Sequence, residues 1–289
     1  MPPSPLAQDV VRILELCRKE RNRHRISLSF SYIYRSGLVI HASLGSYVVM
    51  MMVEDGNILY TKEVFERLIC QDHYLWNALI IGYVKYGEIH EALDLYETMI
   101  QRECVIYANN LAFVSLLSAC TILQDMERGE GIYSEIARRG FHETDVFIGS
   151  SLINMYAKCG FMRKANDVFN KQLIQNVVSW TAIISAYVEV NQAEKALQLF
   201  WQMQTEVVSP DKLAAVAVFQ ACCSLAENSE IIINSRSNKS IALEIGQALR
   251  DDTCTKDFSS DVFLNSSLLN MYSKCGAIME AECMFGSLS

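Results

Sequence analysis

The chain has 289 residues, of which 51% are apolar and 20% are charged, and its formal net charge is −8 at pH 7. The apolar content is enough for a continuous core, while the acidic balance disfavours bulk, non-specific nucleic-acid binding, which normally shows as a basic domain. A narrow basic groove on an acidic body remains compatible with it. The most apolar stretch, residues 37–53, is too short and too interrupted to span a bilayer, so we expect no membrane partner.

The sequence repeats itself. Residues 145–169 return 116 residues later as residues 261–285, with 14 of the 25 positions identical. Trp76 and Trp180 lie 104 residues apart, and so do Tyr83 and Tyr187. Repetition on this scale replaces a single globular core with stacked units, so we expect a quasi-one-dimensional array.

Each repeated unit is predicted to contain two helices. In residues 73–109, apolar side chains recur at the i, i+3, i+4, i+7 spacing of an amphipathic helix. They are Trp76, Leu79, Ile80 and Tyr83, and after a turn at Gly87 a second stripe follows at Ala92, Leu93, Tyr96 and Met99. Residues 177–211 repeat the pattern around a break at 189–192. Trp76, Trp180 and Trp201 are interpreted as packing residues between helices.

In chain order, the units come in three lengths. We divide the chain into a degenerate long unit (1–41), a short unit (42–72), a middle unit (73–109), a long unit (110–145), a second short unit (146–176), a second middle unit (177–211), a second long unit (212–261) and a truncated short unit (262–289). The second long unit carries a polar insert at about 229–241. We interpret the insert as a disordered loop between two helices, or as sequence that is not truly coding.

Several short strings mark the units. The middle units contain Trp76-Asn77-Ala78-Leu79-Ile80 and Trp180-Thr181-Ala182-Ile183-Ile184, and the first long unit contains Leu117-Ser118-Ala119-Cys120. The short units contain Met155-Tyr156-Ala157-Lys158-Cys159-Gly160 and its copy Met271-Tyr272-Ser273-Lys274-Cys275-Gly276.

These strings resemble the motifs of the plant pentatricopeptide repeat family, in its PLS subclass of alternating long, short and 35-residue motifs. The resemblance implies an all-α fold, a right-handed α-solenoid of helix-turn-helix repeats. The protein-binding tetratricopeptide repeat is disfavoured because its eighth position needs a small residue, where this chain has Ile80 and Ile184.

In the resembled family each repeat contacts one nucleotide of single-stranded RNA through its fifth and last residues. Carried over by position, the resemblance implies the pairs Ser46 with Asp72 (favouring G), Asn77 with Asn109 (a pyrimidine, C more than U), Ser150 with Asn176 (A) and Thr181 with Asp211 (G), and an unpaired Ser266 (a purine). Val114 and Val216, at the fifth place of the long units, receive no base. Two groups have an alternative structural role: Ser150, Thr181 and Ser266 as helix caps, and Asp72, Asn109, Asn176 and Asp211 as turn or capping residues.

Three lysines occupy one further equivalent place. Lys85, Lys158 and Lys274 each follow the fifth residue by eight positions, about two turns along the same helix face. They are candidates for RNA phosphate contacts or, equally, solvated helix ends near the C-terminal dipole. Glu54 and Glu189 stand at this place in two other units, so we expect a shallow salt dependence of binding.

The sequence offers no catalytic constellation, and we expect neither an enzyme nor a cofactor. The ten cysteines contain no Cys-x-x-Cys pair, and the histidines share no ligand spacing with them, so no metal site is predicted. The carboxyl-terminal zinc deaminase domain that members of the resembled family often carry would need His-x-Glu and Cys-x-x-Cys pieces, which are absent.

The resemblance implies sequence-specific binding of single-stranded organellar RNA. The chain would then be a specificity factor in C-to-U editing or RNA processing, with an editing deaminase or accessory factor acting in trans. A mitochondrial or chloroplast location follows from the resemblance alone, because the amino-terminal sequence is unlike a transit peptide. The alternatives are a protein-interaction scaffold with a decayed RNA face and a truncated paralogue.

Overall fold

The computed structural model of the chain describes residues 42–54, 56, 58–66, 68, 71–101, 108–140, 145–227, 237–255 and 261–287, together with the isolated residues 12, 16 and 35. The degenerate unit expected at 1–41 therefore lies almost wholly outside the described residues. Every regular element in the described ranges is an α-helix, and these ranges contain no strand, so the predicted all-α class is confirmed. None of their helices is long and apolar enough to cross a membrane.

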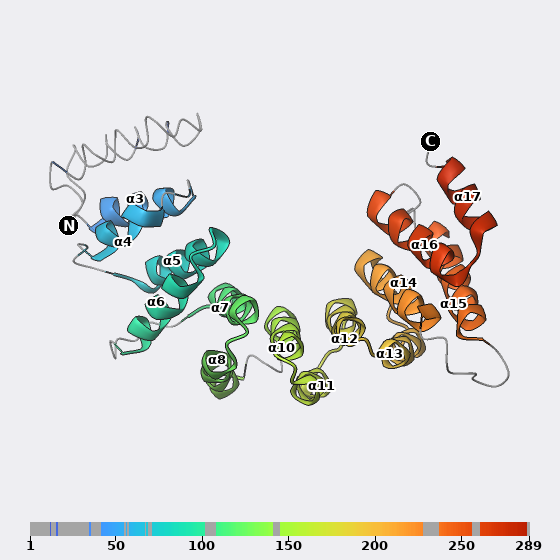
Figure 1. Ribbon diagram of the computed structural model, residues 1–289. Coiled ribbons are helices and arrows are strands. Elements are labelled where there is room, and N and C mark those ends of the chain that lie inside the picture. The colour runs from blue at the N-terminus through green and yellow to red at the C-terminus, as the bar shows by residue number, and fades with distance from the viewer. Residues whose placement is uncertain are drawn as a thin grey trace. The chain divides into compact units, whose positions relative to one another are not determined.

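The chain divides into two compact units, Met1–Leu123 and Gln124–Ser289. The described helices of the first unit are α3 (Ala42–Glu54), α4 (Ile58–Glu66), α5 (His73–Lys85), α6 (Ile89–Gln101) and α7 (Asn110–Leu123) (Figure 1). Helices α3, α5 and α7 contact one another in sequence order, and α4 and α6 pack behind them. We call the first helix of each hairpin an A helix and the second a B helix.

The second unit continues this hairpin pattern. Its described helices are α8 (Met126–Arg138), α10 (Val146–Lys158), α11 (Met162–Lys171), α12 (Val177–Glu189), α13 (Ala193–Thr205), α14 (Lys212–Glu227), α15 (Asn238–Thr255), α16 (Val262–Cys275) and α17 (Ile278–Ser287) (Figure 1). The A helices α10, α12, α14 and α16 contact one another in order, and each packs against its B helix, α11, α13, α15 or α17. One layer of A helices therefore faces one layer of B helices.

Local sequence explains where the helices begin and end. Asp145 caps α10 by accepting hydrogen bonds from the backbone N–H groups of Phe147 and Ile148, and Asp261 caps α16 in the same way through Leu264. At the other end of α16, Gly276 adopts a left-handed conformation (φ 81°). Its N–H and the next one bond back to the last turn, which is the Schellman arrangement that glycine favours.

The predicted apolar stripes form the core. Trp76, Leu79, Ile80 and Tyr83 are at most 2% exposed. Trp76 lies edge-on to Phe65, with ring centroids 4.8 Å apart, and Trp180 meets Phe169 at the same 4.8 Å. Each pair ties the B helix of one hairpin to the A helix of the next, contributing about 1 kcal/mol beyond area burial. Trp201 differs from the prediction, because it is half exposed on B helix α13.

The polar insert also differs from its interpretation. Residues 228–236 lie outside the described part of the chain, but residues 238–241 form the first turn of α15. The hydroxyl of Ser237 accepts a hydrogen bond from the N–H of Ser240 at 3.3 Å, as an N-cap does. A disordered loop extending to residue 241 is therefore wrong for these last four residues, because a serine cap starts the helix there.

Candidate functional site

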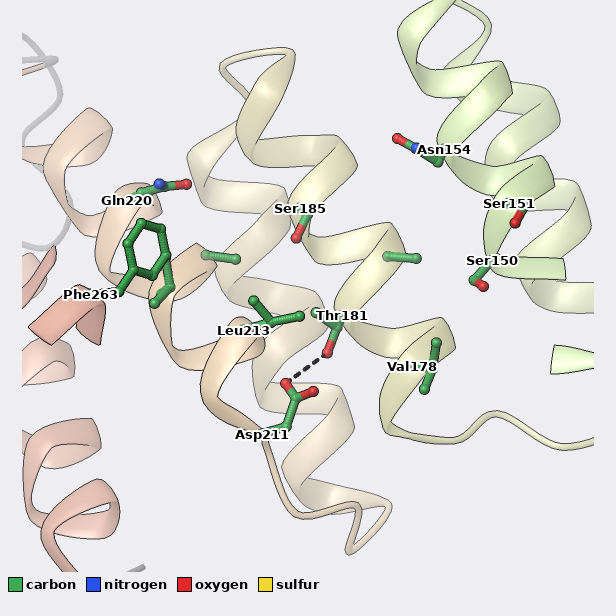
Figure 2. A pocket seen from close by; sticks show the side chains of 13 residues that line it. Ser150, Ser151, Asn154, Val178, Thr181, Ser185, Asp211, Leu213, Gln220 and Phe263 are labelled. Atoms are coloured by element: carbon green, nitrogen blue, oxygen red, sulfur yellow. Dashed lines mark hydrogen bonds between the residues drawn. The ribbon is translucent and has the colours of Figure 1, made fainter. Parts of the chain in front are cut away.

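The A helices of the second unit line a pocket of about 520 Å³ (Figure 2). The pocket brings together Ser150 of α10, Thr181 of α12 and Asp211, which immediately precedes α14. Three residues that were expected to contact RNA bases are therefore close neighbours. Val216, the fifth residue of the long unit, lines the same pocket.

Thr181 and Asp211 are joined directly. The Thr181 hydroxyl donates a hydrogen bond to Oδ1 of Asp211 at 3.2 Å, drawn as the dashed line in Figure 2. The same Oδ1 accepts the N–H of Ala214 at 2.8 Å and so caps α14. The described structure records no hydrogen bond to Oδ2, the second carboxylate oxygen. The two hydrogen bonds fix Oδ1 of Asp211, and Oδ2 still presents a carboxylate acceptor.

The equivalent pair in the first unit is arranged differently. Asn77 is 2% exposed, its Oδ1 accepts the backbone N–H of Asn109 at 2.9 Å, and its Nδ2 donates to the carbonyl of His73 at 2.6 Å. Asn109 itself is exposed and caps α7 by accepting the N–H of Ala112 at 2.8 Å. Both polar ends of Asn77 are therefore used: Nδ2 bonds within α5, and Oδ1 ties α5 to the residue that precedes α7.

Ser150 and Ser266 bond to the backbone of their own helices. The Ser150 hydroxyl donates to the carbonyl of Phe147 at 3.1 Å, and the Ser266 hydroxyl donates to that of Val262 at 2.7 Å. Asn176 makes no hydrogen bond to Ser150 within the described ranges. Ser46 lies in α3.

The capping alternative holds for all four closing residues. Asp72, Asn109, Asn176 and Asp211 each accept a backbone N–H from the first turn of the following A helix. In every case the accepting atom is Oδ1. Capping and base contact are therefore compatible, because the other side-chain atom (Oδ2 of aspartate or Nδ2 of asparagine) is not needed for the cap.

An apolar residue that was not among the predicted site residues lies at the second position of every described A helix except α3, where that residue is Ser43. Tyr74, Leu111, Phe147, Leu213 and Phe263 are 57–68% exposed, and Val178 is half-buried. Val178, Leu213 and Phe263 line the pocket together with Thr181 (Figure 2). The sequence does contain a signal for these positions, because an apolar residue that does not belong to the buried stripe recurs at the same place in successive units. Exposed apolar and aromatic faces of this kind can stack on bases.

The predicted lysine row is largely neutralised by carboxylates. Lys158 Nζ lies 2.8 Å from Oε2 of Glu189, and Lys274 Nζ lies 2.5 Å from Oε1 of Glu227. The hydrogen bond that Lys274 donates to the Glu227 carboxylate raises the pKa of Lys274 above its usual value. Lys85 lies 5.3 Å from the centroid of the Tyr86 ring. Exposed ion pairs contribute at most about 1 kcal/mol, so a phosphate could replace either carboxylate.

Asp261, the last residue of the second long unit, is also ion-paired. Its Oδ2 contacts Nζ of Lys212, and this hydrogen bond lowers the pKa of the carboxyl below its usual value. The described ranges contain no group of three or more His, Cys, Asp or Glu that could hold a metal ion.

Sequence comparison identifies known repeats in the chain. Residues 74–104 and 150–171 match the model of the PPR repeat, and residues 175–224 match that of the PPR repeat family. A putative pentatricopeptide repeat-containing protein of Arabidopsis thaliana is 35% identical over 191 residues, 66% of this chain and 26% of that protein. A chloroplastic relative from the same plant is 30% identical over 96% of this chain and 42% of its own length. A mitochondrial relative is 28% identical over 96% of this chain and 38% of its own length. The chain thus spans well under half of these relatives.

The fold is shared with solved structures. The pentatricopeptide repeat protein PPR10, in complex with an 18-nt psaJ RNA element, superposes with a TM-score of 0.66 over 98% of this chain and 42% of PPR10, at 14% identity. The structure of PPR10 from maize superposes with a TM-score of 0.58 over 99% of this chain and 42% of that one. The α-solenoid class predicted from the sequence is therefore confirmed. With matching repeats in both units, these findings show that the chain is a pentatricopeptide repeat protein.

Proposed function

We propose that this chain binds single-stranded RNA along its A helices and recognises bases one per repeat. The observation that supports this most strongly is the pair formed by Thr181 and Asp211. These residues are at the fifth and last places of one repeat, share a hydrogen bond, and line a pocket with exposed apolar side chains from neighbouring repeats. PPR10, whose fold this chain shares, is known in complex with an RNA element.

The Thr181–Asp211 pair is suited to guanine. The Watson–Crick edge of guanine presents two N–H donors, and a carboxylate oxygen is an acceptor only. Oδ2 of Asp211 can accept one of these donors, and the lone pairs of the Thr181 hydroxyl can accept the other. Adenine presents an acceptor where guanine has a ring N–H, so it would face the carboxylate with two lone pairs opposed. Val178 and Leu213 flank the position where the base would lie.

The other repeats are proposed to follow the same scheme. Ser150 with Asn176 would favour A, Ser46 with Asp72 would favour G, Asn77 with Asn109 would favour a pyrimidine, and Ser266 would favour a purine. Because both polar groups of Asn77 are already bonded, Asn109 would supply the base contact in its repeat. Val114 and Val216 offer no hydrogen bond and would tolerate any base.

We further propose that the chain belongs to the subclass of alternating repeat lengths and acts as a specificity factor in organellar RNA editing or processing. Successive A helices begin at Ala42, His73, Asn110, Val146, Val177, Lys212 and Val262, which supports the proposed short, middle and long division. Relatives carry mitochondrial or chloroplastic names, which supports an organellar location. An editing deaminase or accessory factor would act in trans.

A protein-interaction scaffold is the second candidate. It is favoured by the pairing of Lys158 and Lys274 with carboxylates, which leaves little positive charge for a phosphate backbone. The two candidates differ in one measurable property. A scaffold would show no base preference, and an RNA-binding protein of this kind would.

The test is a binding assay with a fluorescent RNA that carries G-C-U-A-G and a second RNA in which A and G are exchanged. The first RNA should bind at least about tenfold more tightly, because a well-placed base contact gives discrimination of that order. The double variant Thr181→Asn with Asp211→Asn should shift the preference at that base from G to a pyrimidine. The control is Glu194→Gln, an exposed change on B helix α13.

Three results would argue against the proposal in different ways. Equal binding of both RNAs that disappears with modest salt would leave only a weak phosphate contact. An unchanged base preference in the double variant would refute the assignment of Thr181 and Asp211. No binding of either RNA by a folded, helical chain would favour the scaffold.

A further inference from the structure

A second polar row runs along the A helices beside the residues proposed to contact bases. It consists of Asn154, Ser185 and Gln220, each four residues after the fifth position of its repeat, and we call it the inner polar row. All three residues line the pocket and lie at a similar level in Figure 2, above Thr181 and Asp211. The three belong to consecutive A helices, α10, α12 and α14.

The inner polar row has no structural role in the described part of the chain. Asn154 and Gln220 are exposed and Ser185 is half-buried. None of the three side chains makes a hydrogen bond to another described residue, in contrast to Thr181, Ser150 and Asn77. Their amide and hydroxyl groups therefore remain available to a ligand in the pocket.

The order of side chains along α10 matches the order of groups in a nucleotide. A helix rises about 1.5 Å per residue, so the inner polar row lies about 6 Å from the fifth residue and about 6 Å before the lysine position. Lys158 of α10 occupies that lysine position. A nucleotide whose base edge meets the fifth residue and whose phosphate lies toward Lys158 places its ribose at Asn154.

The chemistry of the row fits a ribose hydroxyl better than a phosphate. Amide and hydroxyl side chains donate and accept hydrogen bonds, and so does the 2′-hydroxyl group. Uncharged side chains add no cation to neutralise a phosphate. In α3 and α5 the corresponding places hold Met50 and Ile81, which cannot make this contact, whereas α7 has the exposed Ser118 there.

We propose that Asn154, Ser185 and Gln220 hydrogen-bond the ribose 2′-hydroxyl groups of the bound strand and make the pocket select RNA over DNA. This inference rests on the proposed RNA binding. It predicts that the sugars of the nucleotides bound by α3 and α5 do not contribute to discrimination against the deoxy sugar. Each contact should contribute about fivefold in affinity.

The test compares RNA with DNA of the same sequence, containing deoxyuridine instead of thymidine, on the full chain. The triple variant Asn154→Leu, Ser185→Ala and Gln220→Met keeps the size of each side chain close to the original while removing its hydrogen bonds. Its RNA affinity should fall to near the DNA affinity of the unaltered chain, and its DNA affinity should stay unchanged. Gln202→Met on B helix α13 is the matched control and should change neither.

Single 2′-deoxy substitutions in the RNA sharpen the test. A deoxy sugar at the nucleotide bound by Thr181 should weaken binding about fivefold in the unaltered chain and not in the Ser185→Ala variant. Equal losses for RNA and DNA in the triple variant, or equal affinity of the unaltered chain for both, would overturn this inference and leave RNA binding intact. Failure of the unaltered chain to bind either strand would instead refute the proposed function.

Discussion

The two middle repeats, residues 73–109 and 177–211, use one scaffold for two different arrangements at the proposed base contact. In both, a fully buried tryptophan packs edge-on against the phenylalanine of the preceding hairpin. At the fifth position they diverge. Asn77 is bonded to backbone atoms at both of its polar ends, whereas Thr181 donates to the side chain of Asp211 and leaves one carboxylate oxygen unused. One residue therefore decides whether the position supports the fold or remains open to a ligand.

The largest effect should come from the tryptophans, where the repeats are most alike. Trp76→Ala and Trp180→Ala should each lower the free energy of unfolding by about 3–5 kcal/mol, because each removes a fully buried ring and leaves a cavity. Urea denaturation followed by far-ultraviolet circular dichroism measures the loss. Trp201→Ala is the control and should have a much smaller effect, since that ring is half exposed. A large difference between the two buried sites would show that the repeats are not equivalent in packing.

The fifth position should separate the repeats. Asn77→Ala removes two hydrogen bonds to the backbone and should lower the free energy of unfolding by about 2 kcal/mol. Thr181→Ala removes one hydrogen bond between side chains and should lower it by about 1 kcal/mol or less. The effects on RNA should be reversed, because only Thr181 faces the pocket. We expect Thr181→Ala to reduce the preference for G and Asn77→Ala to leave base preference nearly unchanged. The opposite ranking in either assay would contradict the proposed division of roles.

The sequence predicted what depends on periodicity and not what depends on neighbouring hairpins. The i, i+3, i+4 stripes were sufficient to predict the helices, because burial of one face is a local property of the pattern. The hydrogen bonds of Asn77 and Thr181 were not predictable. The asparagine amide reaches the backbone of Asn109, whereas the shorter threonine hydroxyl reaches only the side chain of Asp211. Both distances are set by how two hairpins pack.

The lysine row shows the same limit. Its members were correctly predicted to occupy equivalent helix positions, but the partners of Lys158 and Lys274 come from other A helices. Glu189 is 31 residues from Lys158 along the chain, and Glu227 is 47 residues from Lys274. No spacing rule within a single helix relates such residues, so only the packed array reveals that these charges are neutralised.

A smaller effect is expected at the short repeats. Gln172 is 8% exposed, and neither of its amide atoms has a hydrogen-bond partner in the described structure, whereas the equivalent residue of the first short repeat is the buried Leu68. Gln172→Met should therefore raise the free energy of unfolding by about 1 kcal/mol, because an unsatisfied buried amide is replaced by an apolar group of similar shape. Urea denaturation measures this change. Gln175→Met is the matched control and should destabilise, because Gln175 donates to the carbonyl of Phe169 at 3.2 Å.

The smallest effect concerns the end of α13, where the second middle repeat has Val207 in a left-handed conformation (φ 59°) and 90% exposed. Its N–H bonds to the carbonyl of Gln204 and that of Val208 to Met203, a Schellman motif whose left-handed place normally holds glycine. A β-branched residue is strained in this conformation. Glycine removes the strain but loses more backbone entropy on folding, so Val207→Gly should raise the free energy of unfolding by only about 0.5 kcal/mol.

Asn191 occupies the same place after α12 (φ 57°) and provides the control. Asparagine tolerates this conformation, so Asn191→Gly should change the denaturation midpoint less than Val207→Gly does. Equal shifts would mean that backbone strain at Val207 is relieved by its surroundings, because two residues with different intrinsic strain would then respond alike.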